Sequence, residues 1–166
     1  ELSGNLCRCT GYRPILDAGQ YMFDLPAVRL DTQPIVQALR ALRRDERFTY
    51  QPQAHAGAHR FHAPVTLDDL AALRESLPKA QILAGSTDVG LWVNKQFRAL
   101  GDILYVGDVE EMKTIEEQEA PGEGRELYIG AGAPLEAAWR ALDARFEGLT
   151  DVWLRFASPP IRNAGT

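Results

Sequence analysis

Two cysteines separated by a single residue are the first side chains in the sequence that could do chemistry. Cys7 and Cys9 are also the only cysteines among the 166 residues. A disulfide between them would close a very small loop and constrain little of the unfolded chain. The thiols are better interpreted as metal ligands or redox groups in a reducing compartment, so we expect a cytoplasmic protein. An iron–sulfur cluster or a cysteine-only zinc site needs four thiolates, so either another segment supplies two more or both cysteines are simply buried.

A glycine turn is the second feature with chemical potential. Ala84-Gly85-Ser86-Thr87-Asp88 lies between an apolar run, which predicts a buried strand over 81–84, and a short helix predicted through Leu91 and Trp92. Gly85 lets the backbone turn tightly and approach a ligand without a Cβ in the way. The next three amides would point out of the turn and form a cradle for an anion such as pyrophosphate. An ordinary strand–glycine–helix turn is the alternative, and the residues of a Walker loop or a G-x-G-x-x-G fingerprint are not present.

The last eleven residues, Phe156 to Thr166, form a third candidate. Arg162 and Asn163 are fixed hydrogen-bond donors, and Gly165-Thr166 offers a second close approach of backbone to a ligand. The alternative interpretation is a surface loop held in place by Arg162.

Composition excludes several classes of protein. No run approaches the roughly 18 apolar residues of a membrane span, and no secretory leader is recognisable. A net charge of −5 makes binding to a nucleic-acid backbone a poor hypothesis. We therefore expect a globular protein with neither a membrane nor a nucleic-acid partner. Because the chain opens at Glu1 and stops at Thr166, directly after a glycine, we also expect it to be an internal fragment.

Only two short helices are predicted before residue 61. A short helix with Pro14 in its first turn should follow the cysteines. A second helix should begin after Asp31-Thr32, with arginines opposite an apolar stripe. From Tyr50 to His62 no periodicity is visible, which predicts a linker. We interpret the three histidines of this region as loop residues and not as metal ligands. The stripe contains Ile35, Val36, Leu39 and Leu42, the arginines are Arg40, Arg43, Arg44 and Arg47, and the histidines are His55, His59 and His62.

Residues 61–166 alternate strand and helix signals. Thr66 and Asp69 form a capping pattern for a helix that ends before Pro78, with Leu67, Leu70 and Leu73 as its buried stripe. Strands are predicted over 81–84, 103–106 and 127–130, and a helix over 134–146. This alternation predicts an α/β (α+β) domain.

Four stretches together resemble one protein family. Gly4-Asn5-Leu6-Cys7-Arg8-Cys9-Thr10-Gly11-Tyr12-Arg13-Pro14-Ile15 closely resembles the second half of the helical [2Fe–2S] domain of the xanthine dehydrogenase and aldehyde oxidase family of molybdenum hydroxylases. Residues 84–96 resemble the flavin pyrophosphate loop of that family's FAD domain, and 129–132 and 156–166 follow at the expected places. Both modules on one chain resemble the small iron–sulfur/FAD subunit of the bacterial xanthine dehydrogenases.

The resemblance implies a fold and a domain division. Residues 1–22 would be the C-terminal part of an all-α [2Fe–2S] domain, and 23–60 an interdomain connector. Residues 61–166 would be the N-terminal part of an α/β (α+β) FAD-binding domain of the molybdopterin dehydrogenase (PCMH) type.

The resemblance also implies site residues. Cys7 and Cys9 would be two of the four ligands of the [2Fe–2S] cluster nearer the molybdenum centre. The pyrophosphate of FAD would be received by Gly85, Ser86, Thr87 and Asp88, with Ile82, Leu83, Ala84 and Val89 completing that wall. Phe156, Ala157 and Thr166 would contact FAD from the other side. Ser86 stands where the family more often has Gly or Asn, but its amide can still donate.

The implied activity is electron transfer within a purine-hydroxylating hetero-oligomer. Electrons would leave a molybdenum cofactor on a molybdopterin-binding large subunit, pass through [2Fe–2S] to FAD, and reach NAD. No residue of this chain is a credible acid, base or nucleophile, so the segment alone should be inactive. Three alternatives stay open: a flavin–iron–sulfur subunit of an aldehyde oxidase or carbon monoxide dehydrogenase, an FAD oxidase module with incidental cysteines, and a structural module whose cysteines share zinc with a partner.

Overall fold

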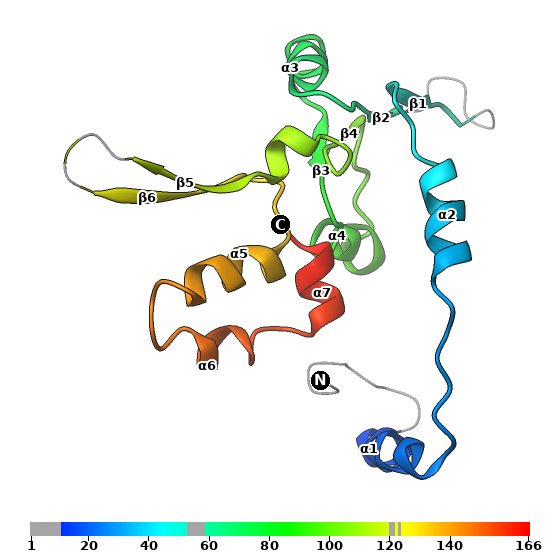
Figure 1. Cartoon of the computed structure of the whole chain (residues 1–166). Helices are drawn as coiled ribbons and strands as arrows, with labels where there is room; N and C mark the ends of the chain where they lie inside the picture. The colour runs from blue at the N-terminus through cyan, green and yellow to red at the C-terminus, as the bar shows by residue number, and fades with distance from the viewer. Residues whose placement is uncertain (1–10, 53–58, 120–121, 123) are drawn as a thin grey trace.

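The computed structural model describes residues 11–52, 59–119, 122 and 124–166. Cys7, Cys9 and His55 therefore lie outside the described residues. Within these ranges the chain forms short helices, one four-stranded sheet and one two-stranded sheet (Figure 1). This mixed α/β architecture agrees with the class predicted for residues 61–166. No helix within the described part of the chain has the length and hydropathy that a bilayer crossing requires.

The first described segment is a helical arm. It contains α1 (Tyr12–Tyr21), the 3-10 helix η1 (Met22–Asp24) and α2 (Gln33–Ala41). Pro14 lies in the first turn of α1, and the amide of Gln33 donates to Asp31 Oδ1 (3.0 Å) where α2 begins, so both predicted helices are confirmed. Most of the predicted apolar stripe of α2 is exposed, however: Leu39 is 62% and Leu42 74% accessible.

The four-stranded sheet has the order β1-β2-β4-β3. Its strands are β1 (Phe48–Tyr50), β2 (Phe61–Ala63), β3 (Gln81–Leu83) and β4 (Ile103–Tyr105). β1 and β2 are antiparallel, whereas β4 runs parallel to both β2 and β3. The predicted linker over 50–62 is thus wrong at both ends, because β1 and β2 pair there. Strands of three residues are too short to show an alternation of apolar and polar residues in the sequence. They are held by contacts between residues distant in the sequence, such as the rings of Phe48 and Phe61, whose centroids lie 6.5 Å apart.

The core lies between the sheet and α3 (Leu67–Ser76). Thr66 Oγ1 accepts from the amide of Asp69 at 3.2 Å, which confirms the predicted cap. Leu70 and Leu73 are buried as predicted, but Leu67 is exposed. The predicted buried strand over 81–84 is an edge strand, β3, and its Ile82 is exposed. The buried cluster is Leu70, Leu73, Ala80, Leu104, Val106 and Val109.

His62 is a buried strand residue, which corrects its interpretation as a loop histidine. Its Nδ1 lies 3.1 Å from Thr49 Oγ1 across the β1–β2 pair. Burial lowers the pKa of His62; among the nearby charges, Asp102 and Asp69 raise it, whereas Arg47 and Arg60 lower it further. Among the described residues no group of three or more His, Cys, Asp or Glu side chains is placed to hold a metal ion.

The described residues after 109 form a 3-10 helix, a hairpin and three α-helices. After the 3-10 helix η2 (Glu110–Lys113), β5 (Ile115–Glu119) pairs antiparallel with β6 (Arg125–Ile129). The helices are α5 (Leu135–Asp143), α6 (Thr150–Trp153) and α7 (Pro159–Ala164), of which α5 and α7 lie side by side (Figure 1). The strand predicted over 127–130 is present as β6, and the helix predicted over 134–146 is present as α5, both with shifted ends. The charged strand β5 carries no apolar alternation and was not predicted.

Candidate functional site

The glycine turn joins β3 to α4 (Val89–Gln96), as predicted. The β3–β4 pairing ends where the amide of Val106 donates to the carbonyl of Leu83 at 2.8 Å. The helix begins with bonds from Gly90 to the carbonyl of Ser86 (3.0 Å) and from Leu91 to that of Asp88 (2.8 Å). Residues 84–87 are therefore free of both the sheet ladder and the helix interior.

The amides of this turn are open to a ligand. Gly85, Ser86, Thr87 and Asp88 are all exposed. In the hydrogen bonds that the structure describes, none of the amides of Ser86, Thr87 and Asp88 acts as a donor. The positive end of the α4 dipole lies at the same place. An anion bound here would receive several N–H groups at once, which is the geometry of a phosphate cradle.

Ser86 adopts a left-handed conformation with φ 61°. Such a residue turns successive amides toward one point, which supports the cradle. Glycine and asparagine tolerate this region better than serine does. The conformation therefore explains why Gly or Asn would be the expected residue types at this position.

Replacing Ser86 with glycine should relieve this backbone strain. We expect Ser86→Gly to raise the free energy of unfolding by up to about 1 kcal/mol, because the gain at positive φ is partly offset by the freer unfolded chain. Urea unfolding of the cofactor-free protein measures the change. A lower stability of the variant would show that the turn does not need the left-handed conformation.

The terminal segment packs directly behind the glycine turn. A Cβ at Gly85 would overlap the carbonyl carbon and oxygen of Ala164 and lie 3.1 Å from the amide nitrogen of Gly165. A Cβ at Gly165 would in turn lie 3.4 Å from Thr87 Oγ1. Figure 1 shows the end of α7 beside the start of α4. Two of the predicted motifs, distant in the sequence, thus form one structure.

The third predicted stretch, 129–132, packs against residues 112–114 and leads into α5. The amides of Gly130 and Gly132 donate to the carbonyls of Thr114 and Met112, both at 2.8 Å. Past this turn the amide of Leu135 donates to the carbonyl of Gly165 at 2.9 Å. The start of α5 therefore holds the backbone that closes the glycine turn.

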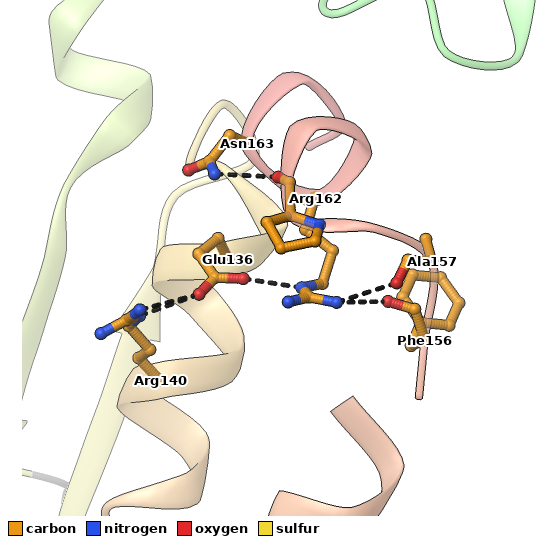
Figure 2. Close-up of polar contacts among 7 residues, drawn as sticks. Glu136, Arg140, Phe156, Ala157, Arg162 and Asn163 are labelled. Atoms are coloured by element: carbon orange, nitrogen blue, oxygen red, sulfur yellow. Dashed lines mark hydrogen bonds and ion pairs between the residues drawn. The ribbon is translucent and has the colours of Figure 1, made fainter. Parts of the chain in front are cut away.

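Arg162 is used inside the protein, so the prediction that it donates to a ligand is wrong, whereas Asn163 is exposed. Arg162 is only 3% exposed. Its Nη1 donates to the carbonyls of Phe156 (2.8 Å) and Ala157 (3.0 Å), and its Nε donates to Glu136 Oε2 (2.6 Å), as Figure 2 shows. Asn163 Nδ2 donates to the carbonyl of Pro159 at 2.8 Å. The alternative interpretation, a loop held in place by Arg162, describes the contacts correctly, but the Arg162 side chain is buried and not at the surface.

The predicted flavin contacts at the end of the chain fall in two places. Thr166 follows Gly165 and is exposed beside the glycine turn. Phe156 and Ala157 lie at the opposite end of α7, where the ring of Phe156 is 6.2 Å from that of Trp139. Of the other predicted residues, Ile82 is exposed, and Leu83, Ala84 and Val89 are half-buried around the turn.

Glu136 takes part in the contacts that hold the terminal segment, and the sequence analysis did not identify it. It lies in the first turn of α5, where no motif marks it. The hydrogen bond from Arg162 holds the pKa of Glu136 below its ordinary value, with Arg140 adding to the effect and burial opposing it. The only available signal was an acidic residue at the start of an amphipathic helix.

The lowered pKa of Glu136 predicts a pH dependence of stability. Its ionised form is stabilised in the folded state, so the contribution is complete above the ordinary pKa of 4.5 and is lost as pH falls through the lowered value. We expect Glu136→Gln to be less stable than the native protein at pH 7. Denaturant unfolding from pH 7 to pH 3 should show this difference shrinking below pH 4.5. A difference independent of pH would contradict the assignment.

Residues 54–166 match the family described as "FAD binding domain in molybdopterin dehydrogenase". The chain is also similar to the xanthine dehydrogenase of Drosophila pseudoobscura pseudoobscura, with 26% identity over 208 aligned residues. That alignment covers 96% of this chain but only 15% of the relative, so the chain spans a small part of the relative's length.

Solved structures show the same fold. Carbon monoxide dehydrogenase from Oligotropha carboxidovorans matches with a TM-score of 0.55 and 23% identity over 68% of this chain and 38% of that chain. Quinoline 2-oxidoreductase from Pseudomonas putida 86 matches with a TM-score of 0.52 and 22% identity over 63% of this chain and 35% of that chain. The match over 54–166 includes the glycine turn and the segment that packs behind it. The chain therefore belongs to the family of FAD-binding domains found in molybdopterin dehydrogenases.

Proposed function

We propose that this chain holds FAD at the turn over 85–88 and serves as an electron-transfer module of a molybdenum hydroxylase of the xanthine dehydrogenase type. One observation carries the proposal: the exposed amides of Ser86, Thr87 and Asp88 are open at the start of α4, while the backbone of Ala164 and Gly165 closes the turn from behind. The comparison with a family named for FAD supports the choice of ligand.

The residues present fit a dinucleotide of this kind. The amides and the α4 dipole would bind the pyrophosphate, and Thr87 Oγ1 adds a hydroxyl at the same place. Ile82 is exposed on the edge strand β3 and offers an apolar wall next to the turn. Phe156, Ala157 and Thr166 are proposed as contacts from the other side. When bound, FAD supplies the exchange between one-electron and two-electron transfer, and the chain's task is to bind and orient it.

The remaining parts of the proposal rest on the sequence and not on the structure. They are Cys7 and Cys9 as two ligands of a [2Fe–2S] cluster, and the division into an iron–sulfur part (1–22), a connector (23–60) and an FAD part (61–166). They also include a purine substrate and a molybdenum cofactor on a molybdopterin-binding large subunit, NAD as electron acceptor, a hetero-oligomeric assembly and a cytoplasmic location.

An absorption spectrum of the intact native protein, combined with iron and flavin analysis, tests this function. We expect flavin bands together with iron–sulfur absorption. A yellow protein without iron would instead support an FAD oxidase module with incidental cysteines. A colourless protein with one bound zinc would support the structural module and overturn the proposal.

A further inference from the structure

A buried ion pair links α7 to α5. Arg162 of α7 and Glu136 of α5 have side chains that are 4% and 12% exposed, with Nε and Oε2 only 2.6 Å apart. The second oxygen of Glu136 accepts from Arg140, whose side chain is 69% exposed. Figure 2 shows the carboxylate between the two guanidinium groups. Charges are rarely buried without a specific arrangement of partners, and here both Nε and Nη1 of Arg162 have acceptors.

The planar guanidinium of Arg162 serves two segments at once. Nε faces Glu136, while Nη1 reaches the carbonyls of Phe156 and Ala157. Its Cζ also lies 5.2 Å from the centre of the Trp153 ring in α6. A lysine ammonium is a point donor on a flexible stem and does not reproduce this fork. Arg162 thus joins α5, α6 and the turn before α7 through one side chain.

The turn that Arg162 holds is strained. Ala157 has φ 52°, a left-handed conformation that disfavours residues with a Cβ. Such conformations persist only where surrounding contacts impose them. The two hydrogen bonds from Arg162 to the carbonyls of Phe156 and Ala157 are those contacts.

The Arg162–Glu136 pair also helps to position the backbone behind the glycine turn. Glu136 follows Leu135, whose amide donates to the carbonyl of Gly165 at 2.9 Å. Arg162 precedes Ala164 and Gly165, which close the turn behind Gly85. Fixing α5 against α7 therefore fixes the backbone on which Gly85 and Thr87 rest.

We propose that Arg162 and Glu136 are positioning residues of the FAD site: neither donates to FAD, and together they orient the Phe156-Ala157 turn and the backbone behind the glycine turn. The inference rests on the proposed function, because it takes both ends of α7 as parts of one flavin site. It differs from a general stabilising role in its consequence, since flavin affinity should fall more than global stability explains.

Flavin binding by the intact protein, stripped of FAD and titrated with FAD, tests the positioning role. We expect Arg162→Met to raise the Kd for FAD by tenfold or more, because the carbonyls of Phe156 and Ala157 and the carboxylate of Glu136 lose a charged donor. Arg162→Lys and Glu136→Gln should give intermediate increases, and the visible circular dichroism of bound flavin should change in all three. Arg140→Ala, at the exposed partner, should stay within about twofold of the native Kd.

Leu73→Ala is the control for stability. It removes a buried side chain of the α3 core, and we expect it to lower the free energy of unfolding by roughly 2–5 kcal/mol. Measured where the variant is still folded, its Kd for FAD should match that of the native protein. The positioning role is overturned if Arg162→Lys and Glu136→Gln keep the native Kd and dichroism, or if Leu73→Ala weakens FAD binding equally. Failure of the native protein to bind FAD would overturn the proposed function instead.

Discussion

Replacing Gly85 with alanine is expected to release FAD from the intact protein. The added methyl group would overlap the carbonyl of Ala164, which is backbone and cannot rotate away as a side chain would. Either the glycine turn or the terminal segment must then move, and both belong to the proposed pyrophosphate site. Because several amides contact the anion together, displacing the turn removes most of the binding free energy at once. We expect flavin occupancy to fall at least tenfold, and valine should have a stronger effect than alanine.

Flavin content per protein, measured after gel filtration, checks this prediction. Gly148→Ala is a suitable control, since Gly148 has φ 95° and nothing lies within 4 Å of its added Cβ. That variant carries ordinary backbone strain of about 1 kcal/mol but leaves the glycine turn untouched. Equal flavin content in Gly85→Ala and the native protein would show that the turn over 85–88 is not the pyrophosphate site.

Replacing Cys7 with alanine is expected to abolish one [2Fe–2S] cluster of the intact protein. The sequence resemblance implies that Cys7 is one of four thiolate ligands, and a cluster that loses a ligand is not retained. Cys9→Ala should have the same effect. Iron and acid-labile sulfide should each fall by the content of one cluster, while flavin content stays unchanged. Under the proposed function, purine oxidation should also be uncoupled from NAD reduction.

Metal analysis also separates this result from the alternatives. Thr10→Ala, next to the cysteines, removes a side chain that is not a thiol and should retain all the iron. Unchanged iron in Cys7→Ala would show that the thiol is not a ligand. Loss of zinc, with no iron in the native protein, would favour the shared zinc site.

Several local features could be predicted because their causes are local. Thr66 caps α3 since its hydroxyl reaches an amide three residues ahead, and Pro14 fits the first turn of α1, where an amide needs no partner. The glycine turn between β3 and α4 is likewise a matter of neighbouring residue types. The strand β1, the charged strand β5 and the burial of His62 were not predictable in this way, because pairing across the sheet decides them.

The role of Arg162 shows where local reasoning ends. As a residue type it is a donor suited to an anionic ligand, and its neighbours in the sequence leave that hypothesis open. Only the packing of α5 against α7 brings Glu136 to its Nε and two carbonyls to its Nη1, so that these two nitrogens donate within the protein. Glu136 itself has no motif and becomes significant only through that contact.

The sequence by itself determined which groups are available to bind a metal or an anion. They are a pair of thiols, a glycine turn with free amides, and a terminal Gly-Thr segment, each defined by residue types within a few positions. The tertiary structure alone decided which of these meet. It places Ala164 against Gly85 and Gly165 near Thr87, and it leaves Phe156 and Ala157 at the far end of α7. The physical reason is that a close approach of two backbones depends on how helices and strands pack, which no local pattern encodes.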